Sequence, residues 1–367
     1  MITTEDFNFE DAVKNALNQV LKERGHINIL IAGRTGVGKS TLINSIFQGN
    51  FATTGQGRPV TEKTKEIKKE GIPLSIFDTR GLELADFPKI LDELKKEINE
   101  RSKNIDSSQH IHVAWICIAE DSRRVEPAEE ELVKTFVNYN IPVIAVITKA
   151  RSDQGFRAKV QEILPQVSNT VRIRAISEEL DEGIVLPAMG LKNLVDSTIQ
   201  VVPEGLKRAF TAAQKVDIEL KKTKSHVIVA GSAASAAGIA AIPIPFSDAV
   251  GIVPIQIGML AGISATFGLS IDEIFLGTIL GTIIAGTGGT MVGRLIVGGL
   301  LKMIPGIGSV AGGTIAATTA AAITTALGEA YIAALAMLFV QNNGEPPTSD
   351  EVATAFKENY RKLSGGK

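Results

Sequence analysis

The chain has 367 residues, with 38 basic and 40 acidic side chains, so its formal charge at pH 7 is −2. This balance argues against a general nucleic-acid binder, and we predict no nucleic-acid partner. Cys117 is the only cysteine, which excludes an intrachain disulfide framework and a cysteine metal site. The length exceeds what a single hydrophobic core usually organises and therefore favours two domains.

The first 200 residues or so alternate apolar, β-rich runs with helical stretches. Buried strands are expected at Ile27–Ala32, Leu74–Asp78, Ile111–Ala119, Ile141–Thr148 and Val171–Ile176. Helices are expected at Lys39–Phe47, Phe87–Glu100, Ala128–Tyr139, Gln154–Leu164 and Leu191–Val201. Strands separated by helices predict right-handed crossovers. The fold class is therefore α/β, with a mostly parallel sheet covered by helices on both faces.

A glycine-rich motif follows the first strand and opens the first helix of this segment. Its residues, with the residue after it, are the predicted phosphate-binding set: Gly33, Arg34, Thr35, Gly36, Val37, Gly38, Lys39, Ser40 and Thr41. Backbone N–H groups of such a loop and of the helix N-terminus surround phosphate oxygens. Lys39 is expected to bridge the β- and γ-phosphates as the catalytic cation, and Ser40 to ligate Mg²⁺.

The second predicted strand ends in Asp78-Thr79-Arg80-Gly81. A carboxylate at this place can hold the metal through water, so Asp78 is a predicted metal and nucleotide residue. The backbone N–H of Gly81 is expected to meet the γ-phosphate, which makes Gly81 a catalytic candidate.

These motifs resemble those of Era-like and septin-like P-loop GTPases of the TRAFAC class, over roughly residues 25–200. The resemblance implies GTP or GDP as ligand with Mg²⁺ as cofactor, and a first switch within Gly55–Lys65. Thr61 is our candidate for the metal-capping, catalytic switch threonine, with Thr64 second. The resemblance also assigns base recognition to Thr148-Lys149 and a last base-contacting loop to Ala175-Ile176-Ser177, in which Ser177 is the candidate residue.

Two positions depart from that family. The aspartate that accepts hydrogen bonds from guanine is replaced by Arg151, and the nearest carboxylate is Asp153, so the preference for GTP over ATP rests on the resemblance alone. The glutamine that orients the attacking water is replaced by Leu82, which predicts slow hydrolysis unless a partner, a second copy of the chain or another loop supplies a polar group. Arg34 and Arg80 are either charge stabilisers or members of structural ion pairs.

Residues Pro203–Ser225 are expected to form a helical connector. Its cations are Lys207, Arg208, Lys215, Lys221, Lys222 and Lys224. They form either a solvated helix face or a basic collar at a membrane surface.

The following 115 residues, 227–341, carry only two basic and four acidic side chains but 19 of the 35 glycines. Charge-free windows of 20 or more residues occur at Val227–Ser247, Ala249–Ile271, Ile274–Gly293 and Met303–Gly328, long enough to cross about 30 Å of hydrocarbon. A Gly-x3-Gly spacing typical of close helix contact in lipid begins at Gly258, Gly277, Gly289 and Gly308. Prolines 243, 245, 254 and 305 are expected to break these windows into short hairpins or re-entrant segments rather than straight spans. A soluble Ala-rich helical bundle is the alternative.

The segment 225–340, including Ile242–Asp248, resembles an uncharacterised domain found C-terminal to bacterial Era-like GTPases. We therefore predict a helical extension over 1–26, a GTPase domain over 27–202, a basic linker over 203–225, a membrane-associated helical domain over 226–341 and a polar tail over 342–367. The functional hypothesis is a slow GTPase that acts as a membrane-bound nucleotide switch. Its GTPase domain would be cytoplasmic, and its partners would be lipids or a second copy of the chain. The alternative is a soluble nucleotide-holding scaffold.

Overall fold

The computed structural model describes residues 9–49, 51, 65–79, 87–240, 247–272, 275–279 and 317–363. The chain divides into two compact units. One is an α/β unit, Gly25–Asp217, and the other is a helical unit made of Met1–Arg24 together with Ile218–Lys367. The helical unit therefore draws on sequence from both sides of the α/β unit.

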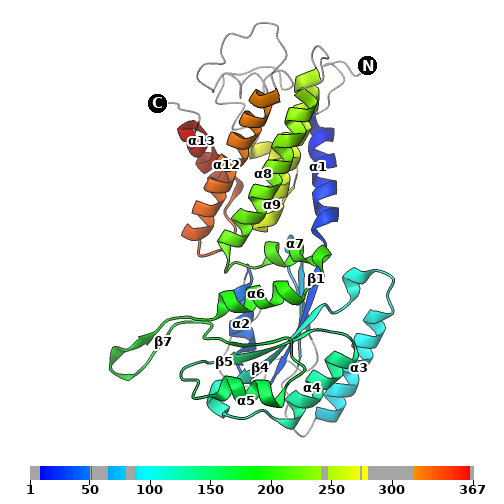
Figure 1. Cartoon of the computed structure of the whole chain (residues 1–367), viewed down its shortest axis with the longest axis vertical. Helices are drawn as coiled ribbons and strands as arrows, with labels where there is room; N and C mark the ends of the chain where they lie inside the picture. Colours follow the sequence, from blue (N-terminus) through cyan, green and yellow to red (C-terminus); the bar gives the residue numbers. More distant parts are fainter. Residues whose placement is uncertain are drawn as a thin grey trace. The chain divides into compact units, whose positions relative to one another are not determined.

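The α/β unit is built on a six-stranded sheet whose order is β2-β3-β1-β4-β5-β6 (Figure 1). Its strands are β1 (Ile27–Gly33), β2 (Lys65–Lys68), β3 (Leu74–Asp78), β4 (Val113–Ala119), β5 (Val143–Thr148) and β6 (Asn169–Arg172). The β2 strand runs antiparallel to β3, and every other pair in this sheet is parallel. The predicted mostly parallel sheet is confirmed, because continuous apolar runs form strands buried on both faces.

Helices cover both faces of this sheet, as predicted. The first layer, α3 (Phe87–Ser102), α4 (Pro127–Asn138) and α5 (Phe156–Ile163), shares one apolar core with the inward side chains of β1, β4 and β5. The second layer comprises α2 (Lys39–Ile46), α6 (Leu191–Val201) and α7 (Glu204–Ala213). In its core the Phe47 ring stacks on Trp115 at 5.7 Å and meets Phe210 edge-on at 6.1 Å.

Two parts of the sheet differ from the prediction. The last strand was expected at Val171–Ile176 but ends at Arg172. Ile173 still donates its N–H to the Ile147 carbonyl, whereas Arg174 exchanges backbone hydrogen bonds with Met189, so the chain leaves the sheet there. The edge strand β2 was not predicted, because its charged sequence Lys-Glu-Ile-Lys lacks an apolar run.

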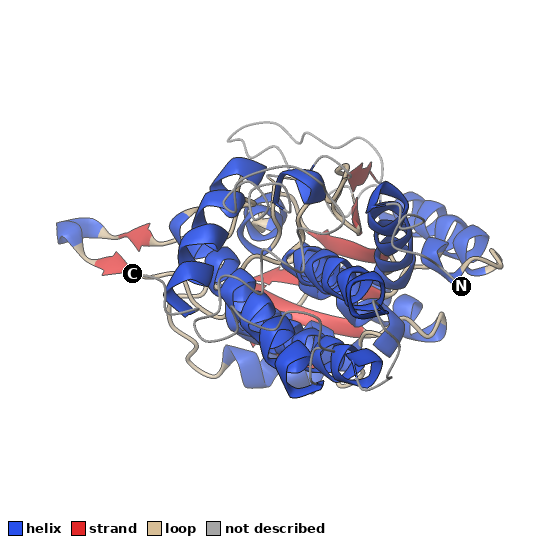
Figure 2. Cartoon of the chain, turned by 90° about the horizontal axis from the view of Figure 1, so that it is seen from above, coloured by secondary structure: helices blue, strands red, loops and turns tan. Residues whose placement is uncertain are grey.

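A β-hairpin that the sequence did not predict follows β6. Its strands are β7 (Glu178–Glu179) and β8 (Val185–Leu186), which pair antiparallel around a turn at Asp181–Gly183. Figures 1 and 2 show the hairpin extending away from the six-stranded sheet. Ile184 and Val185 at its far end are 54% and 59% exposed, so it presents apolar side chains to solvent.

The helical unit has five long helices among the residues that the structure describes: α1 (Phe9–Arg24), α8 (Ile218–Ala240), α9 (Ser247–Phe267), α12 (Ala317–Gln341) and α13 (Ser349–Leu363). The central helix is α12, which packs against α8, α9 and α13. Its Tyr331 hydroxyl lies 2.6 Å from that of buried Ser264, and its ring meets Phe356 of α13 at 5.0 Å. Within the described ranges, α12 is the single helix long and apolar enough to cross a membrane, and 61% of its apolar window is buried inside the structure.

The connector predicted over 203–225 is divided between two helices. Helix α7 ends at Ala213 and α8 begins at Ile218, with the turn between them held by the Gln214 side chain, which accepts from the Asp217 N–H and donates to the Asp217 carbonyl. Lys221 is not a surface cation. It is fully buried, and its ammonium donates to the Phe267 carbonyl at 2.9 Å, at the C-terminus of α9.

Two expectations for the apolar segment also change. Pro254 lies inside α9 and does not end it. A proline inside a helix costs about 3 kcal/mol, and the burial of the nearby Val253 and Ile257 side chains offsets this cost. A Cβ on Gly258 would meet no atom within 4 Å, so this glycine does not serve close helix contact. The tight approach is at Gly328, where a Cβ would lie 2.4 Å from Val229. Prolines 243, 245 and 305 lie outside the described residues, as do the glycine pairs that begin at Gly289 and Gly308. Of the pair that begins at Gly277, only Gly277 is described, and a Cβ there would meet no atom within 4 Å.

Candidate nucleotide-binding site

The predicted phosphate loop connects the end of β1 to the first residue of α2, Lys39. Gly36 and Gly38 have φ angles of 74° and 99°, in the left-handed region that favours glycine. A Cβ on Gly33 would lie 2.5 Å from the Cys117 carbonyl on the neighbouring strand, so only glycine fits there. Helix α2 has no side-chain N-cap, which leaves its first N–H groups to face an anion.

The side chains of this loop are already organised. Lys39 folds over the loop and donates to the carbonyls of Gly33 at 2.8 Å and Arg34 at 3.3 Å. The Arg34 guanidinium instead pairs with Glu126 at the N-terminus of α4, at 3.2 Å. Of the two roles considered for Arg34, the structure therefore shows the ion pair.

Asp78 lies at the end of β3, in register with Ile31 of β1, and is 7% exposed. Cys117 lies on β4, on the other side of β1, and the charges at this edge of the sheet act on the pKa of its thiol. Burial raises its pKa to about 12, while the Lys39 charge acts to lower it and the Asp78 charge to raise it. Lys39 and Asp78 thus gather at the carboxyl edge of the sheet, where ligands of open α/β folds bind. The other predicted residues of this region, Thr61 and Gly81, lie outside the described residues, as do Thr64, Arg80 and Leu82.

The predicted base-recognition residues begin at the end of β5. The Thr148 hydroxyl donates to the carbonyl of Val37 at 2.7 Å and is 3.3 Å from that of Ile118. This hydrogen bond joins the segment 148–153, called the base loop from here on, to the phosphate loop. Lys149 follows in a left-handed conformation, with its ammonium 4.0 Å from Asp121. Ser177 is exposed in the segment between β6 and β7.

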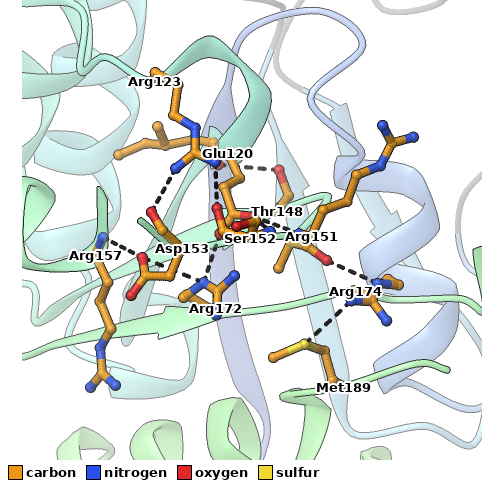
Figure 3. A network of polar contacts seen from close by, with 12 residues as sticks. Glu120, Arg123, Thr148, Arg151, Ser152, Asp153, Arg157, Arg172, Arg174 and Met189 are labelled. Carbon is orange, nitrogen blue, oxygen red and sulfur yellow. Dashed lines mark hydrogen bonds and ion pairs between the residues drawn. The ribbon is translucent and has the colours of Figure 1, made fainter. Parts of the chain in front are cut away.

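A buried carboxylate that the sequence reading missed organises the base loop (Figure 3). Glu120, directly after β4, is 2% exposed and accepts hydrogen bonds from the backbone N–H groups of Arg151 and Ser152 and from the Arg172 guanidinium, at 2.5, 2.9 and 2.6 Å. Burial acts to raise its pKa, but the bonds from Arg172, Arg151 and Ser152 together hold the pKa below its ordinary value. Its place just after a strand end was the one signal in the sequence.

Asp153, considered as a substitute for the missing aspartate, has a structural role. Its carboxylate accepts the backbone N–H of Arg157 at the start of α5, at 2.8 Å, and lies 3.7 Å from the Arg172 guanidinium. Arg151 itself turns to Glu178 of β7 and forms a two-pronged ion pair, with Nε 2.9 Å from Oε2.

This geometry agrees with two family matches. The 50S ribosome-binding GTPase family matches residues 28–149, and a domain of unknown function, DUF697, matches residues 207–361. The chain therefore matches a P-loop GTPase domain followed by a DUF697 domain. Both resemblances found in the sequence are confirmed, and the α/β unit is a GTP-binding GTPase domain.

Several named proteins are similar to this GTPase over part of their length. GTPase Der of Aquifex aeolicus is 25% identical over 51% of this chain and 42% of its own, and GTPase Era of Thermoanaerobacter sp. is 26% identical over 49% and 55%. Translocase of chloroplast 101 of Physcomitrium patens is 40% identical over 21% of this chain and 9% of its own. The chain thus spans between 9% and 55% of these relatives.

Solved structures similar to this GTPase include a probable GTP-binding protein engB, at 23% identity and a TM-score of 0.34 over 47% of this chain and 97% of that one. Another is Aquifex aeolicus Era bound to GDP and AlF4−, at 20% identity and a TM-score of 0.36 over 60% and 69% of the two chains.

Proposed function

We propose that this protein is a nucleotide switch that binds GTP or GDP with Mg²⁺ and hydrolyses GTP slowly. The observation that carries the proposal is the phosphate loop between β1 and α2, joined to the base loop by the bond from Thr148 to Val37. That bond supports a single assembly in which the two loops would recognise phosphate and base together. The positive end of α2 and the Lys39 ammonium would hold the phosphates.

The residues present fit a magnesium ion. Ser40, at the start of α2, and Asp78, at the end of β3, offer hydroxyl and carboxylate oxygens. The phosphate loop that leads to Ser40 leaves β1, which is the direct neighbour of β3. Oxygen ligands are what Mg²⁺ prefers. Thr61 would complete the protein ligands in the triphosphate state. When bound, the ion neutralises charge on the phosphate oxygens.

The slow rate follows from Leu82, because an apolar side chain cannot orient the attacking water. A second copy of the chain would supply the missing polar group, so the hydrolysis rate per molecule should rise with protein concentration. Leu82→Gln should retain activity. A fast rate that does not depend on concentration would contradict this part of the proposal.

The binding test is titration with fluorescent GTP. Lys39→Ala should weaken binding on the order of 100-fold, because it removes the cation that faces the phosphates. Lys159→Ala is a matched control, since Lys159 on α5 is exposed and contacts only Glu162 among the described ion pairs. Wild-type affinity in Lys39→Ala would overturn the proposed site.

We also propose that the helical unit associates with a membrane. The support is the length and apolar character of α12 and the scarcity of charge over 227–341. One observation favours a soluble helical scaffold instead. Helix α13 packs Val352, Phe356 and Tyr360 inward while its charged residues face outward, which is the arrangement of a bundle in water.

A further inference from the structure

We propose that Glu178 supplies the carboxylate that accepts hydrogen bonds from the N1–H and 2-amino groups of guanine, with Arg151 as its positioning residue. This inference rests on the proposed binding of GTP and GDP and names the residue that selects the base.

Other carboxylates beside the base loop already serve other partners. Both oxygens of Glu120 accept from donors within the protein, and its side chain is buried. Asp153 caps α5 through the Arg157 N–H. Asp121, in the turn after β4, forms only an exposed pair with Lys149, at 4.0 Å, so it is the rival acceptor that Asp121→Asn tests.

Glu178 lies beside the predicted base-contacting residues. It follows Ser177 directly, the predicted last base-contacting residue, and its side chain is 31% exposed. Two arginines fix it relative to the base loop. Arg151 pairs with its carboxylate, and Arg174 donates to the carbonyl of Ala150 at 2.9 Å and to that of Pro187, at the root of the hairpin, at 2.6 Å. The hairpin root and the base loop therefore form one structure.

The protonation state of the Glu178 carboxyl suits a hydrogen-bond acceptor. The Arg151 hydrogen bond holds the pKa of this carboxyl below its usual range, and the charges of Arg174 and Lys149 act in the same direction. The group is thus an ionised acceptor at neutral pH. The arginine fork uses the two lone pairs of the carboxylate that point the same way, and the two neighbouring donors of guanine need that same face. Guanine would therefore take this face while Arg151 keeps a single bond to an outer lone pair.

Base analogues isolate this contact. Inosine diphosphate lacks the 2-amino donor, and xanthosine diphosphate carries a carbonyl acceptor at the same place. A carboxylate therefore favours GDP over both. A glutamine amide in the same place can donate to the xanthine carbonyl and reverses that preference.

The experiment measures the affinity of the full chain for GDP, IDP, XDP and ADP by competition with fluorescent GDP. The wild-type protein should prefer GDP over IDP on the order of tenfold, because one hydrogen bond to a charged group is lost. Glu178→Gln should lower the GDP:XDP affinity ratio on the order of 100-fold, Glu178→Asp should keep most of it, and Arg151→Ala should lower it on the order of tenfold. Glu179→Gln is the matched control, since this exposed neighbour on β7 should leave all four affinities unchanged.

A wild-type GDP:XDP ratio in Glu178→Gln would overturn the inference, as would a ratio that moves with Asp121→Asn and not with Glu178→Gln. An unchanged ratio in Arg151→Ala would overturn the positioning role. A wild-type chain that binds ADP as tightly as GDP would instead overturn the proposed function, so the two failures are distinguishable.

Discussion

Thr148 and Glu120 fix the base loop from two directions. The Thr148 hydroxyl holds it against the phosphate loop, and the Glu120 carboxylate accepts the backbone N–H groups at Arg151 and Ser152. Neither side chain needs to touch the nucleotide for the site to depend on it. Such supporting groups set the geometry that the ligand meets.

Thr148→Val keeps the shape of the side chain and removes its hydroxyl. We expect affinity for GDP to fall about five- to tenfold, because the Val37 carbonyl loses its partner and the two loops separate more easily. Fluorescent GDP titration measures this. Thr170→Val is the control. Thr170 is also buried in the sheet, on β6, but its hydroxyl has no partner among the described residues, so this change should leave GDP affinity intact.

Glu120→Gln should lower the free energy of unfolding by about 2–3 kcal/mol at pH 7, because it leaves the Arg172 guanidinium without its buried counter-charge. Since the pKa of Glu120 in the folded state is lowered from 4.5, its contribution is complete above that value and is lost as the pH falls below it. Urea denaturation at pH 7 and pH 4 should therefore show a smaller difference between variant and wild type at pH 4. Glu162→Gln, at an exposed pair, should change stability by less than about 0.5 kcal/mol.

Helix α12 owes its close contact with α8 to one glycine. The space above Gly328 is filled by Val229 of α8, and Met259 of α9 lies 3.1 Å from the place that a Cβ would occupy. Three helices therefore converge at this point. The residue fixes their separation, whereas Gly258, in the Gly-x3-Gly spacing singled out from the sequence, faces open space.

Gly328→Ala tests this packing. Alanine gains about 1 kcal/mol of helix propensity, but the added methyl must displace Val229, and overpacking a core costs about 1–3 kcal/mol. We expect a net loss and a lower midpoint of thermal unfolding, followed by circular dichroism of the full chain. Gly258→Ala is the matched control and should hold or raise the midpoint. A higher midpoint in Gly328→Ala would show that α8 and α12 are not in close contact.

The elements that the sequence revealed are those with strong local patterns. The phosphate loop and the parallel strands follow from a glycine motif and apolar runs. The hairpin β7–β8 could not be predicted from the sequence, because each strand has only two residues and Glu178-Glu179 shows no apolar alternation. Lys221 was misplaced for a different reason. Its burial depends on carbonyl groups of α9 some 45 residues away, which no local pattern records.

At the scale of the whole molecule, the two units differ in polarity. The α/β unit has a polar exterior of many ion pairs, and the helical unit has α12, which is apolar enough for lipid yet largely buried within the structure. Whether the full chain stays soluble without detergent therefore decides between the membrane-bound switch and the soluble scaffold.

Residues 25–217 expressed alone should be soluble and bind GDP, because they form a compact unit with its own core. The full chain should sediment with membranes and resist carbonate or high salt, since salt screens attraction to headgroups but not burial in hydrocarbon. Release by salt would indicate a peripheral contact. A full chain that stays soluble without detergent would favour the scaffold.

Because the helical unit combines segments from before and after the α/β unit, its parts become available for packing at different times during synthesis. Helix α1 leaves the ribosome before the α/β unit, but α9, against which its Val13 and Leu17 are buried, follows more than 200 residues later. At typical elongation rates that interval lasts roughly 10–50 seconds. The α/β unit can complete its fold during this time, while α1 waits with an uncovered apolar stripe. The nascent chain thus carries an early docking target for chaperones.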